Sequence, residues 1–128
     1  MEEYRDEKLA FYWHEGILIC DWLIEEADYE LVELGIKVRK EMTGNKQIVM
    51  LSDVRNLKFI TRAGRERLAG KDGGEGVIAV VINSKVQAIM YNFFSMIYRE
   101  PSPAKVFTNK EEAIKWCKKF INEDSGPK

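Results

Sequence analysis

The chain has 128 residues, 45% hydrophobic and 32% charged, which predicts one globular domain with a single core. Its 20 basic and 21 acidic side chains give a formal net charge of −1, so no overall positive field favours nucleic acid or an anionic membrane. No apolar run approaches the roughly 20 residues of a membrane-spanning helix, and the N-terminus, MEEYRDEK, lacks the features of a signal peptide. Cys20 and Cys117 stand far apart among apolar residues, so we expect buried, reduced thiols in a cytoplasmic protein.

The chain begins with a predicted hairpin. Residues 9–14 alternate between two faces, with Leu9, Phe11 and Trp13 on one of them, which is typical of a half-buried strand. Glu15-Gly16 is a tight turn, and residues 17–23 form the returning strand.

A helix and a buried strand are expected next. Asp28 is placed to cap the helix, and Gly44 ends it. The core stripe of this helix contains Leu31, Leu34, Val38 and Met42. Residues 47–51 are apolar without alternation, as in a central strand covered on both faces.

Two further β/α units follow. Thr61 can cap a short helix that reaches about Ala69, and the apolar run 77–82 is the strongest candidate for the centre of the sheet. Ser84 with Gln87 forms a capping box for a helix to about Tyr98.

The end of the chain predicts an edge strand over residues 105–107 and a last helix. Thr108 with Glu111 forms the capping box of that helix. Its inward side chains are Ala113, Cys117 and Phe120. We expect the tail, residues 122–128, to be disordered.

The predicted order is β-β-α-β-α-β-α-β-α. Strands that alternate with helices indicate an α/β fold with a mixed, mostly parallel sheet, to which the first hairpin adds an antiparallel pair.

The stretch from Asp53 to Gly64, DVRNLKFITRAG, resembles a known signature at identical spacing. That signature, D-L-S-x-V-x-F-[IM]-D-S-[ST]-G, belongs to the STAS domains, the anti-sigma-factor antagonists and their SpoIIAA-like relatives. The positions in register are Asp53, Val54, Leu57, Phe59, Ile60 and Gly64. The resemblance implies a single STAS-like domain over residues 1–121, and the predicted element order is the order of that fold.

The family's phospho-accepting hydroxyl has no counterpart here. The acceptor position corresponds to Ala63, the preceding serine to Arg62, and the aspartate before it to Thr61. Phosphorylation at Ala63 is chemically impossible, so the resemblance implies a STAS-like protein without the usual phosphoswitch. We interpret the hydroxyl of Thr61 as the helix cap rather than as a phosphate acceptor.

In that family the signature loop and the start of the next helix form the working surface. The residues that the resemblance assigns to partner binding here are Arg55, Lys58, Thr61, Arg62, Gly64 and Arg65. Within the segment the cations, together with Arg67 and Lys71, face only Glu66. Two interpretations are open: a docking patch for an acidic protein surface or a phosphate group, and a solvated amphipathic helix.

The predicted helix from Ser84 to Tyr98 has scarcely any polar face, although one sheet face needs only a narrow apolar stripe. Three interpretations are open: self-association in a homodimer, core packing, or binding of a lipid or small apolar ligand, as in the SEC14-type domains that resemble STAS domains in fold. The residues expected to carry self-association are Met90, Phe93, Phe94 and Ile97.

Signals of enzymatic chemistry are absent from the sequence. His14 is the only histidine, which excludes a two-histidine metal site, and no GxSxG, Walker loop, GxGxxG or HExxH motif occurs. We expect neither a cofactor nor a metal. Asp21, within an apolar strand, marks a site together with Asp53 or is an edge-strand charge that points to solvent.

The sequence therefore predicts a cytoplasmic protein of bacterial type that acts by binding rather than by catalysis. The leading function is a regulatory protein-interaction module, and the alternative is a carrier or sensor of an apolar small molecule or lipid.

Overall fold

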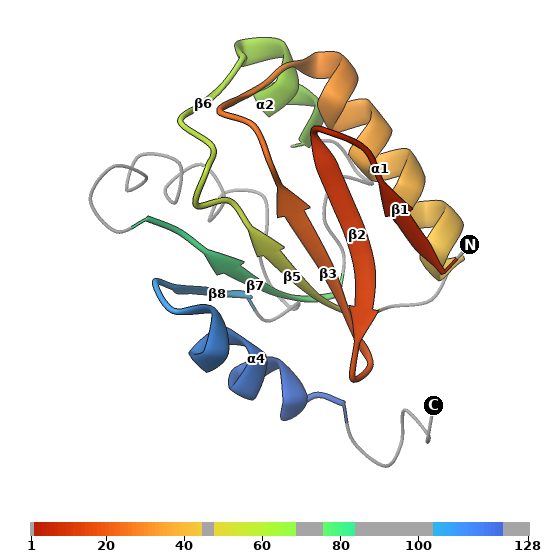
Figure 1. Ribbon diagram of the computed structural model, residues 1–128, viewed down its shortest axis with the longest axis vertical. Coiled ribbons are helices and arrows are strands. Elements are labelled where there is room, and N and C mark those ends of the chain that lie inside the picture. The colour runs from red at the N-terminus through yellow and green to blue at the C-terminus, as the bar shows by residue number, and fades with distance from the viewer. Residues whose placement is uncertain (1, 45–47, 69–75, 84–103, 122–128) are drawn as a thin grey trace.

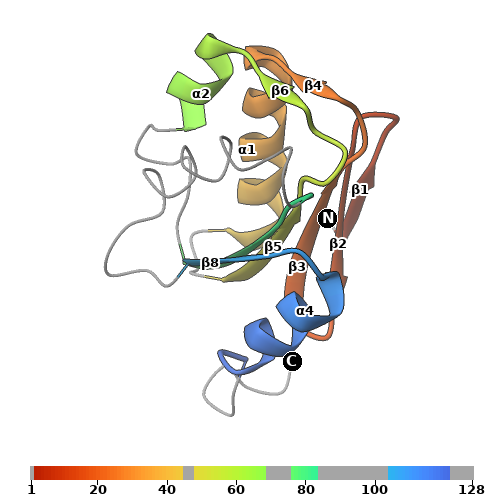
Figure 2. The ribbon, with the colours of Figure 1, turned by 90° about the vertical axis from the view of Figure 1, so that its left-hand side faces the viewer.

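The computed structural model describes residues 2–44, 48–68, 76–83 and 104–121, and places helices on both faces of a sheet (Figures 1 and 2). The described strands of the main sheet have the spatial order β1-β2-β3-β5-β7-β8, with bounds β1 Glu3–Arg5, β2 Leu9–His14, β3 Ile17–Trp22, β5 Val49–Asp53, β7 Val77–Val81 and β8 Ala104–Phe107. Strands β1, β2 and β3 are antiparallel neighbours, whereas β3, β5, β7 and β8 are parallel. The expected α/β class, with a mixed and mostly parallel sheet, is confirmed.

A second, smaller sheet and three helices complete the described elements. The small sheet pairs β4 (Glu26–Ala27) with β6 (Phe59–Ile60) in parallel. The helices are α1 (Tyr29–Thr43), α2 (Arg62–Leu68) and α4 (Lys110–Lys118). Strands β1, β4 and β6 add to the predicted order. They are only two or three residues long, too short to produce a periodic hydrophobic pattern.

The core lies on both faces of the main sheet, because side chains along a strand point alternately to opposite sides. On one face the strands pack against α1 and α2, with Leu18 and Met50 among the buried residues. On the other face Ile19 and Leu51 pack with Ala113 and Cys117 of α4.

This two-sided cover corrects the expectation of a half-buried strand over residues 9–14. Leu9, Ala10 and Phe11 are all buried, at 0%, 0% and 1% exposure, and only the second half of β2 becomes exposed. The reason is that both faces of β2 are covered near its start: Leu9 and Phe11 belong to the core beside α1, and Tyr12 packs partly against the core beside α4.

The predicted centre of the sheet was also wrong. The run 77–82 contains β7, which lies one strand from the β8 edge, whereas β3 and β5 occupy the middle of the order. A continuous apolar run indicates that both faces of a strand are covered, as they are for β7. It does not indicate how far the strand lies from the edge of the sheet. The expected edge strand near residues 105–107 is confirmed as β8.

Most local turn and cap predictions are confirmed. Glu15 and Gly16 have φ of 53° and 86°, as a two-residue hairpin requires, and the Asp28 side chain accepts a hydrogen bond from the Leu31 backbone N–H. The capping box at Thr108 was wrong by one residue. Asn109 caps α4, because its side-chain oxygen accepts from the Glu112 N–H at 2.9 Å.

Two predictions lie outside the described residues. They are the helix from Ser84 to Tyr98, with its self-association positions Met90, Phe93, Phe94 and Ile97, and the tail, residues 122–128.

Candidate functional site at the carboxyl end of the sheet

Two aspartates meet where β3 and β5 end. The parallel register places Asp21 of β3 directly beside Asp53 of β5. In-register side chains on adjacent parallel strands share one face, and the strands are about 4.8 Å apart. Because β3 is an internal strand, Asp21 is not an edge-strand charge, and its position beside Asp53 is the one that the other interpretation requires.

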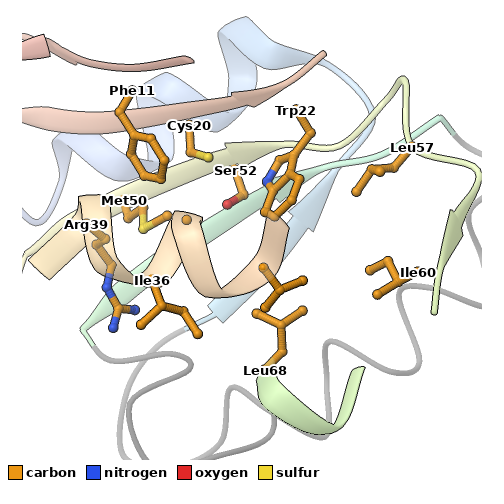
Figure 3. Close-up of a pocket in the computed structure, with 12 residues that line it drawn as sticks. Phe11, Cys20, Trp22, Ile36, Arg39, Met50, Ser52, Leu57, Ile60 and Leu68 are labelled. Atoms are coloured by element: carbon orange, nitrogen blue, oxygen red, sulfur yellow. The ribbon is translucent and has the colours of Figure 1, made fainter. Parts of the chain in front are cut away.

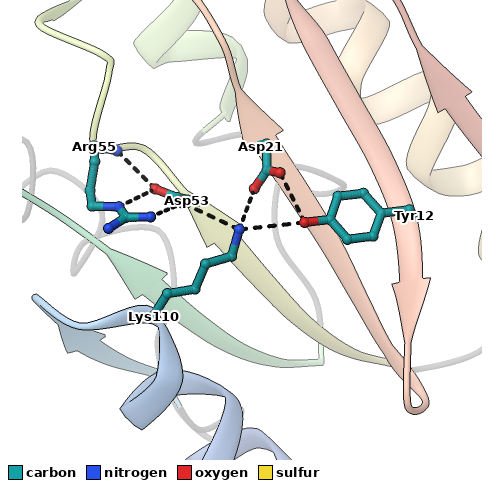
Figure 4. A network of polar contacts seen from close by, with 5 residues as sticks. All are labelled: Tyr12, Asp21, Asp53, Arg55 and Lys110. Atoms are coloured by element: carbon teal, nitrogen blue, oxygen red, sulfur yellow. Dashed lines mark hydrogen bonds and ion pairs between the residues drawn. The ribbon is translucent and has the colours of Figure 1, made fainter.

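A lysine from the other end of the chain lies between these carboxylates (Figure 4). Lys110, the first residue of α4, places its Nζ 3.0 Å from Asp21 Oδ1 and 3.4 Å from Asp53 Oδ2. The Tyr12 hydroxyl of β2 donates a hydrogen bond to Asp21 Oδ2 at 3.0 Å. Segments far apart in sequence therefore converge on one polar cluster, and the Asn109 cap directs the first residue of α4 toward it.

Arg55 closes the cluster on the side of the signature loop. Its Nε donates to Asp53 Oδ1 at 3.0 Å and its Nη2 donates to Asp53 Oδ2 at 2.8 Å. Its backbone N–H also donates to Asp53 Oδ1. The Asp53 side chain is 11% exposed, whereas that of Arg55 is 45% exposed, so the arginine shields the carboxylate and keeps one edge in solvent.

The surroundings of the cluster shift the pKa values of Asp53, Lys110 and Tyr12. Burial opposes ionisation of Asp53, but hydrogen bonds from Arg55 and the charges of Arg55 and Lys110 outweigh it and lower the pKa of Asp53. Burial likewise opposes the charge of Lys110, yet the hydrogen bond to Asp21 and the nearby carboxylates raise the pKa of Lys110. Burial and the hydrogen bond to Asp21 raise the pKa of Tyr12. The cluster therefore pairs two carboxylates with two cations.

The five clustered residues, Tyr12, Asp21, Asp53, Arg55 and Lys110, form an ionic clasp that joins the sheet to the signature loop and to α4. Within the described ranges no group of three or more histidine, cysteine, aspartate or glutamate side chains is arranged to hold a metal ion. Lys110 lies between the two aspartates, so the contacts of the cluster connect α4 to β3 and β5.

The signature loop leads from the clasp into α2, and its cap is confirmed. Thr61 Oγ1 accepts a hydrogen bond from the Gly64 N–H at 3.1 Å. Gly64 itself is buried, and a Cβ there would stand 3.1 Å from Ile60 Cγ2 and 3.3 Å from Val32 Cγ2. The lack of a side chain at Gly64 thus lets α2 pack closely against α1. Ala63 is exposed.

Most cations of the expected basic patch are paired, and two of them, Lys58 and Arg67, pair with acids from other segments. Arg55 pairs with Asp53, and Lys58 pairs with Glu25 at 3.4 Å. Arg62 pairs with Glu66 one helical turn away. The remaining described cations of the patch are Arg67, which pairs with Glu33, and Arg65, which donates to the Ile60 carbonyl. Arg62 and Lys58 still project into solvent, with side chains 84% and 65% exposed.

Beside these cations lies an apolar feature that the sequence did not reveal. Of the large hydrophobic residues that are exposed in the described chain, Leu23, Tyr29 and Phe59 belong to segments joined by the β4–β6 pairing, and Trp13 does not. Phe59 is the most exposed, at 51%. Figure 2 shows β4, β6, α2 and the start of α1 gathered at one end of the molecule.

We call this end the β4–β6 surface and define it by Leu23, Glu25, Glu26, Tyr29, Lys58, Phe59 and Arg62. The sequence could not have predicted that Phe59 is exposed, because Phe59 occupies a position of the signature that is normally apolar. Its neighbours Leu57 and Ile60 are buried, and Phe59 lies on the face of the small sheet opposite Ile60, beside the exposed Glu26.

A cavity of about 40 Å³ lies on the other side of the signature loop, between the sheet and helices α1 and α2 (Figure 3). Its walls include Phe11, Trp22 and Met50, with Cys20 and Ser52 among the few polar groups. Burial raises the pKa of the Cys20 thiol well above its usual value, so that side chain remains a neutral part of the core. Ligand pockets are on the order of 300–1,000 Å³, so this cavity is much too small for a lipid chain.

Comparison with known proteins identifies the fold and a family. A model of the family described as "Domain of unknown function (DUF7793)" matches residues 11–121. No curated protein matches. Among solved structures, an uncharacterised protein of the DUF3478 family with a SpoIIAA-like fold, from Shewanella loihica PV-4, superposes with a TM-score of 0.59. It is 19% identical, and the match covers 85% of this chain and 91% of that one. The SpoIIAA-like fold that the signature suggested is thereby confirmed.

None of the described helices combines the length and the apolar character needed to cross a bilayer.

Proposed function

We propose that this chain, which belongs to the DUF7793 family and has a SpoIIAA-like fold, is a non-catalytic regulatory module that binds a protein partner through its β4–β6 surface. The observation that carries the proposal is the exposure of Phe59, which Lys58 precedes and Arg62 follows along the chain, with exposed Leu23 and Tyr29 before and after β4. Aromatic and arginine side chains dominate the binding energy of protein interfaces, and clustered exposed apolar residues mark such sites.

The electrostatics of the ionic clasp support a role without catalysis. A general acid or base works best with a pKa near the operating pH. Here the pKa of Asp53 is lowered, and the pKa values of Lys110 and Tyr12 are raised, so all three move away from neutrality. We infer that the clasp holds the signature loop in the shape that presents the β4–β6 surface.

The module works without the phosphoswitch of the antagonist family. Ala63 has no hydroxyl, and the hydroxyl of Thr61 is engaged with the Gly64 N–H. We therefore propose that partner binding is regulated by competition for the surface. The buried free thiols of Cys20 and Cys117 agree with action in the cytoplasm.

The alternative function, carriage of a lipid or apolar ligand, has less support. The expected ligand site, beneath residues 84–98, lies outside the described residues; among the described ones, the apolar cavity under α1 is about 40 Å³, well below a usual ligand pocket, and the more open hollow beside Ile48, Val77 and Phe120 is about 270 Å³. Native mass spectrometry of the purified protein checks this directly, and a retained apolar ligand of constant mass would favour the carrier.

The binding proposal is tested with matched variants. The wild type, Phe59→Ser and a control, Lys115→Ala on the exposed side of α4, are immobilised and exposed to a lysate of the source organism. We expect a partner that binds the wild type and the control but not Phe59→Ser. Calorimetry with the purified partner should then show binding weakened at least tenfold by Phe59→Ser, as for an aromatic anchor. Equal binding by all the variants would exclude this surface.

A further inference from the structure

The cations of the β4–β6 surface are already engaged within the chain. Lys58 pairs with Glu25 at 3.4 Å, and Arg62 pairs with Glu66 at 3.1 Å. Both pairs are exposed, so each presents a positive and a negative group side by side, and the field of such a pair falls off quickly in salt solution. An approaching partner therefore meets little net positive charge from the signature segment.

Two exposed glutamates at the same end of the molecule lack such a partner. Glu26 belongs to the β4–β6 surface, and Glu30 follows Tyr29 in the first turn of α1. In the part of the chain that the structure describes, neither glutamate forms an ion pair. Glu30 favours the dipole of α1 from its first-turn position. The charge left uncompensated at this end is therefore negative, whereas the sequence of the signature segment had suggested a positive one.

The carboxylate of Glu26 and the exposed ring of Phe59 occupy one face. The two residues are register partners across the parallel β4–β6 pair, so their side chains leave the same side of the small sheet. Phe59 is 51% exposed, and Tyr29, which precedes Glu30, is 44% exposed. An aromatic ring beside a carboxylate suits a cationic group, which can stack on the ring and pair with the carboxylate at the same time.

We propose that the protein partner of the β4–β6 surface presents a basic segment, in which an arginine lies against Phe59 and pairs with Glu26. The inference rests on the proposed function for the location of the surface and adds the chemistry of the partner. Arginine suits the position better than lysine, because a planar guanidinium group both stacks on an aromatic ring and donates two hydrogen bonds to a carboxylate. An acidic partner would be opposed by the uncompensated glutamates, and like charges across an interface suppress wrong partners.

The test uses three capped peptides that differ in one pair of side chains, which are arginine, its neutral isostere citrulline, or glutamate. Each peptide is titrated at low salt into the isotope-labelled full chain, and the backbone amide signals are followed by nuclear magnetic resonance. We expect the arginine peptide alone to shift the signals of Glu26, Tyr29 and Phe59, with millimolar affinity. Added salt should weaken this binding, because the ion pair is exposed.

Matched variants identify the carboxylates that contribute. Glu26→Gln should weaken binding of the arginine peptide about threefold, as the loss of one exposed ion pair predicts, and addition of Glu30→Gln should bring the loss to about tenfold. The controls are Glu111→Gln, an exposed glutamate in the first turn of α4, and Glu41→Gln near the end of α1. Both should bind as the wild type does, and circular dichroism should show that every variant is folded.

Several results would overturn the inference. Equal binding of the citrulline peptide, or an unchanged affinity in Glu26→Gln, would show that charge pairing plays no part. Absence of binding at millimolar concentration, or signal shifts confined to another surface, would have the same consequence. Preferential binding of the glutamate peptide beside Phe59 would also overturn it, although the β4–β6 surface itself would then be supported. The Phe59→Ser capture experiment is read independently of the peptides, so the two proposals fail separately.

Discussion

Asp53 is shared by two cations from different segments. Its Oδ2 accepts from Arg55 Nη2 at 2.8 Å and stands 3.4 Å from Lys110 Nζ. Arg55 belongs to the signature loop and Lys110 begins α4, so one carboxylate fixes the position of both segments relative to β5. The assignment of Arg55 to partner binding is therefore incomplete, because two of its guanidinium nitrogens and its backbone N–H already bind Asp53.

Thr61 caps the N-terminus of α2. Its hydroxyl satisfies the Gly64 N–H, one of the groups that the first turn of α2 leaves without a helical partner. Thr61→Ala should lower the free energy of unfolding by about 1 kcal/mol. Thr61→Asp should be tolerated or stabilising, because aspartate also caps and its charge favours the helix dipole. Urea unfolding measures both, and equal effects would contradict the cap.

Ala63 leads to a prediction about modification. Incubation with an anti-sigma-type kinase and ATP should add no phosphate to α2, because the acceptor position lacks a hydroxyl and the neighbouring Thr61 hydroxyl serves as the cap. Intact-mass measurement checks this, and stoichiometric phosphothreonine at Thr61 would contradict it.

At the scale of elements, the short turns place the strands that carry the site. Gly76, just before β7, has φ of 86°, and a Cβ there would stand 2.4 Å from the Ile48 carbonyl oxygen. The same carbonyl accepts from the Val77 N–H at 3.0 Å. Two chain segments therefore approach as closely as their backbones permit, which brings β7 into register beside β5.

Gly76→Ala should consequently destabilise the protein more than Gly44→Ala. Gly44 also has positive φ, at 68°, but a Cβ there meets nothing within 4 Å. Gly44→Ala should cost only backbone strain, about 1–2 kcal/mol. Gly76→Ala adds a steric clash and should cost ~3 kcal/mol or more. Chemical unfolding compares the variants, and similar losses would show that the close approach relaxes.

At the scale of the whole molecule, the ionic clasp joins the sheet, the signature loop and α4. Asp53 has a lowered folded-state pKa, so its stabilisation is complete above the unfolded value, about 3.9, and is lost as the pH falls through the folded value. Lys110 has a raised pKa, so its stabilisation is complete below about 10.4 and is lost as the pH rises through the folded value. The clasp should therefore contribute fully across the neutral range.

Asp53→Asn tests this contribution. At neutral pH the variant should be less stable by about 2 kcal/mol, the size of hydrogen bonds to a charged group. As the pH falls through the folded pKa of Asp53, the wild type and the variant should converge. Unfolding curves over a pH series measure the difference, with Glu41→Gln as the control for loss of a surface carboxylate. A difference that stays constant into acid would show that the ionised state of Asp53 is not what stabilises the fold.

Local and near-local signals were sufficient for much of this protein. The Glu15-Gly16 turn, the Asp28 and Thr61 caps and the twelve-residue signature each depend on a few neighbouring residues, and the SpoIIAA-like fold followed from that signature and the element order. Tertiary structure decided what depends on contacts between distant segments. It placed Lys110 between Asp21 and Asp53, neutralised Lys58 with Glu25, and left Phe59 outward on a two-residue strand. The partners and the exposure of a side chain depend on which other segments cover it in the folded protein. Periodicity along the chain indicates only on which side of its own helix or strand the side chain lies.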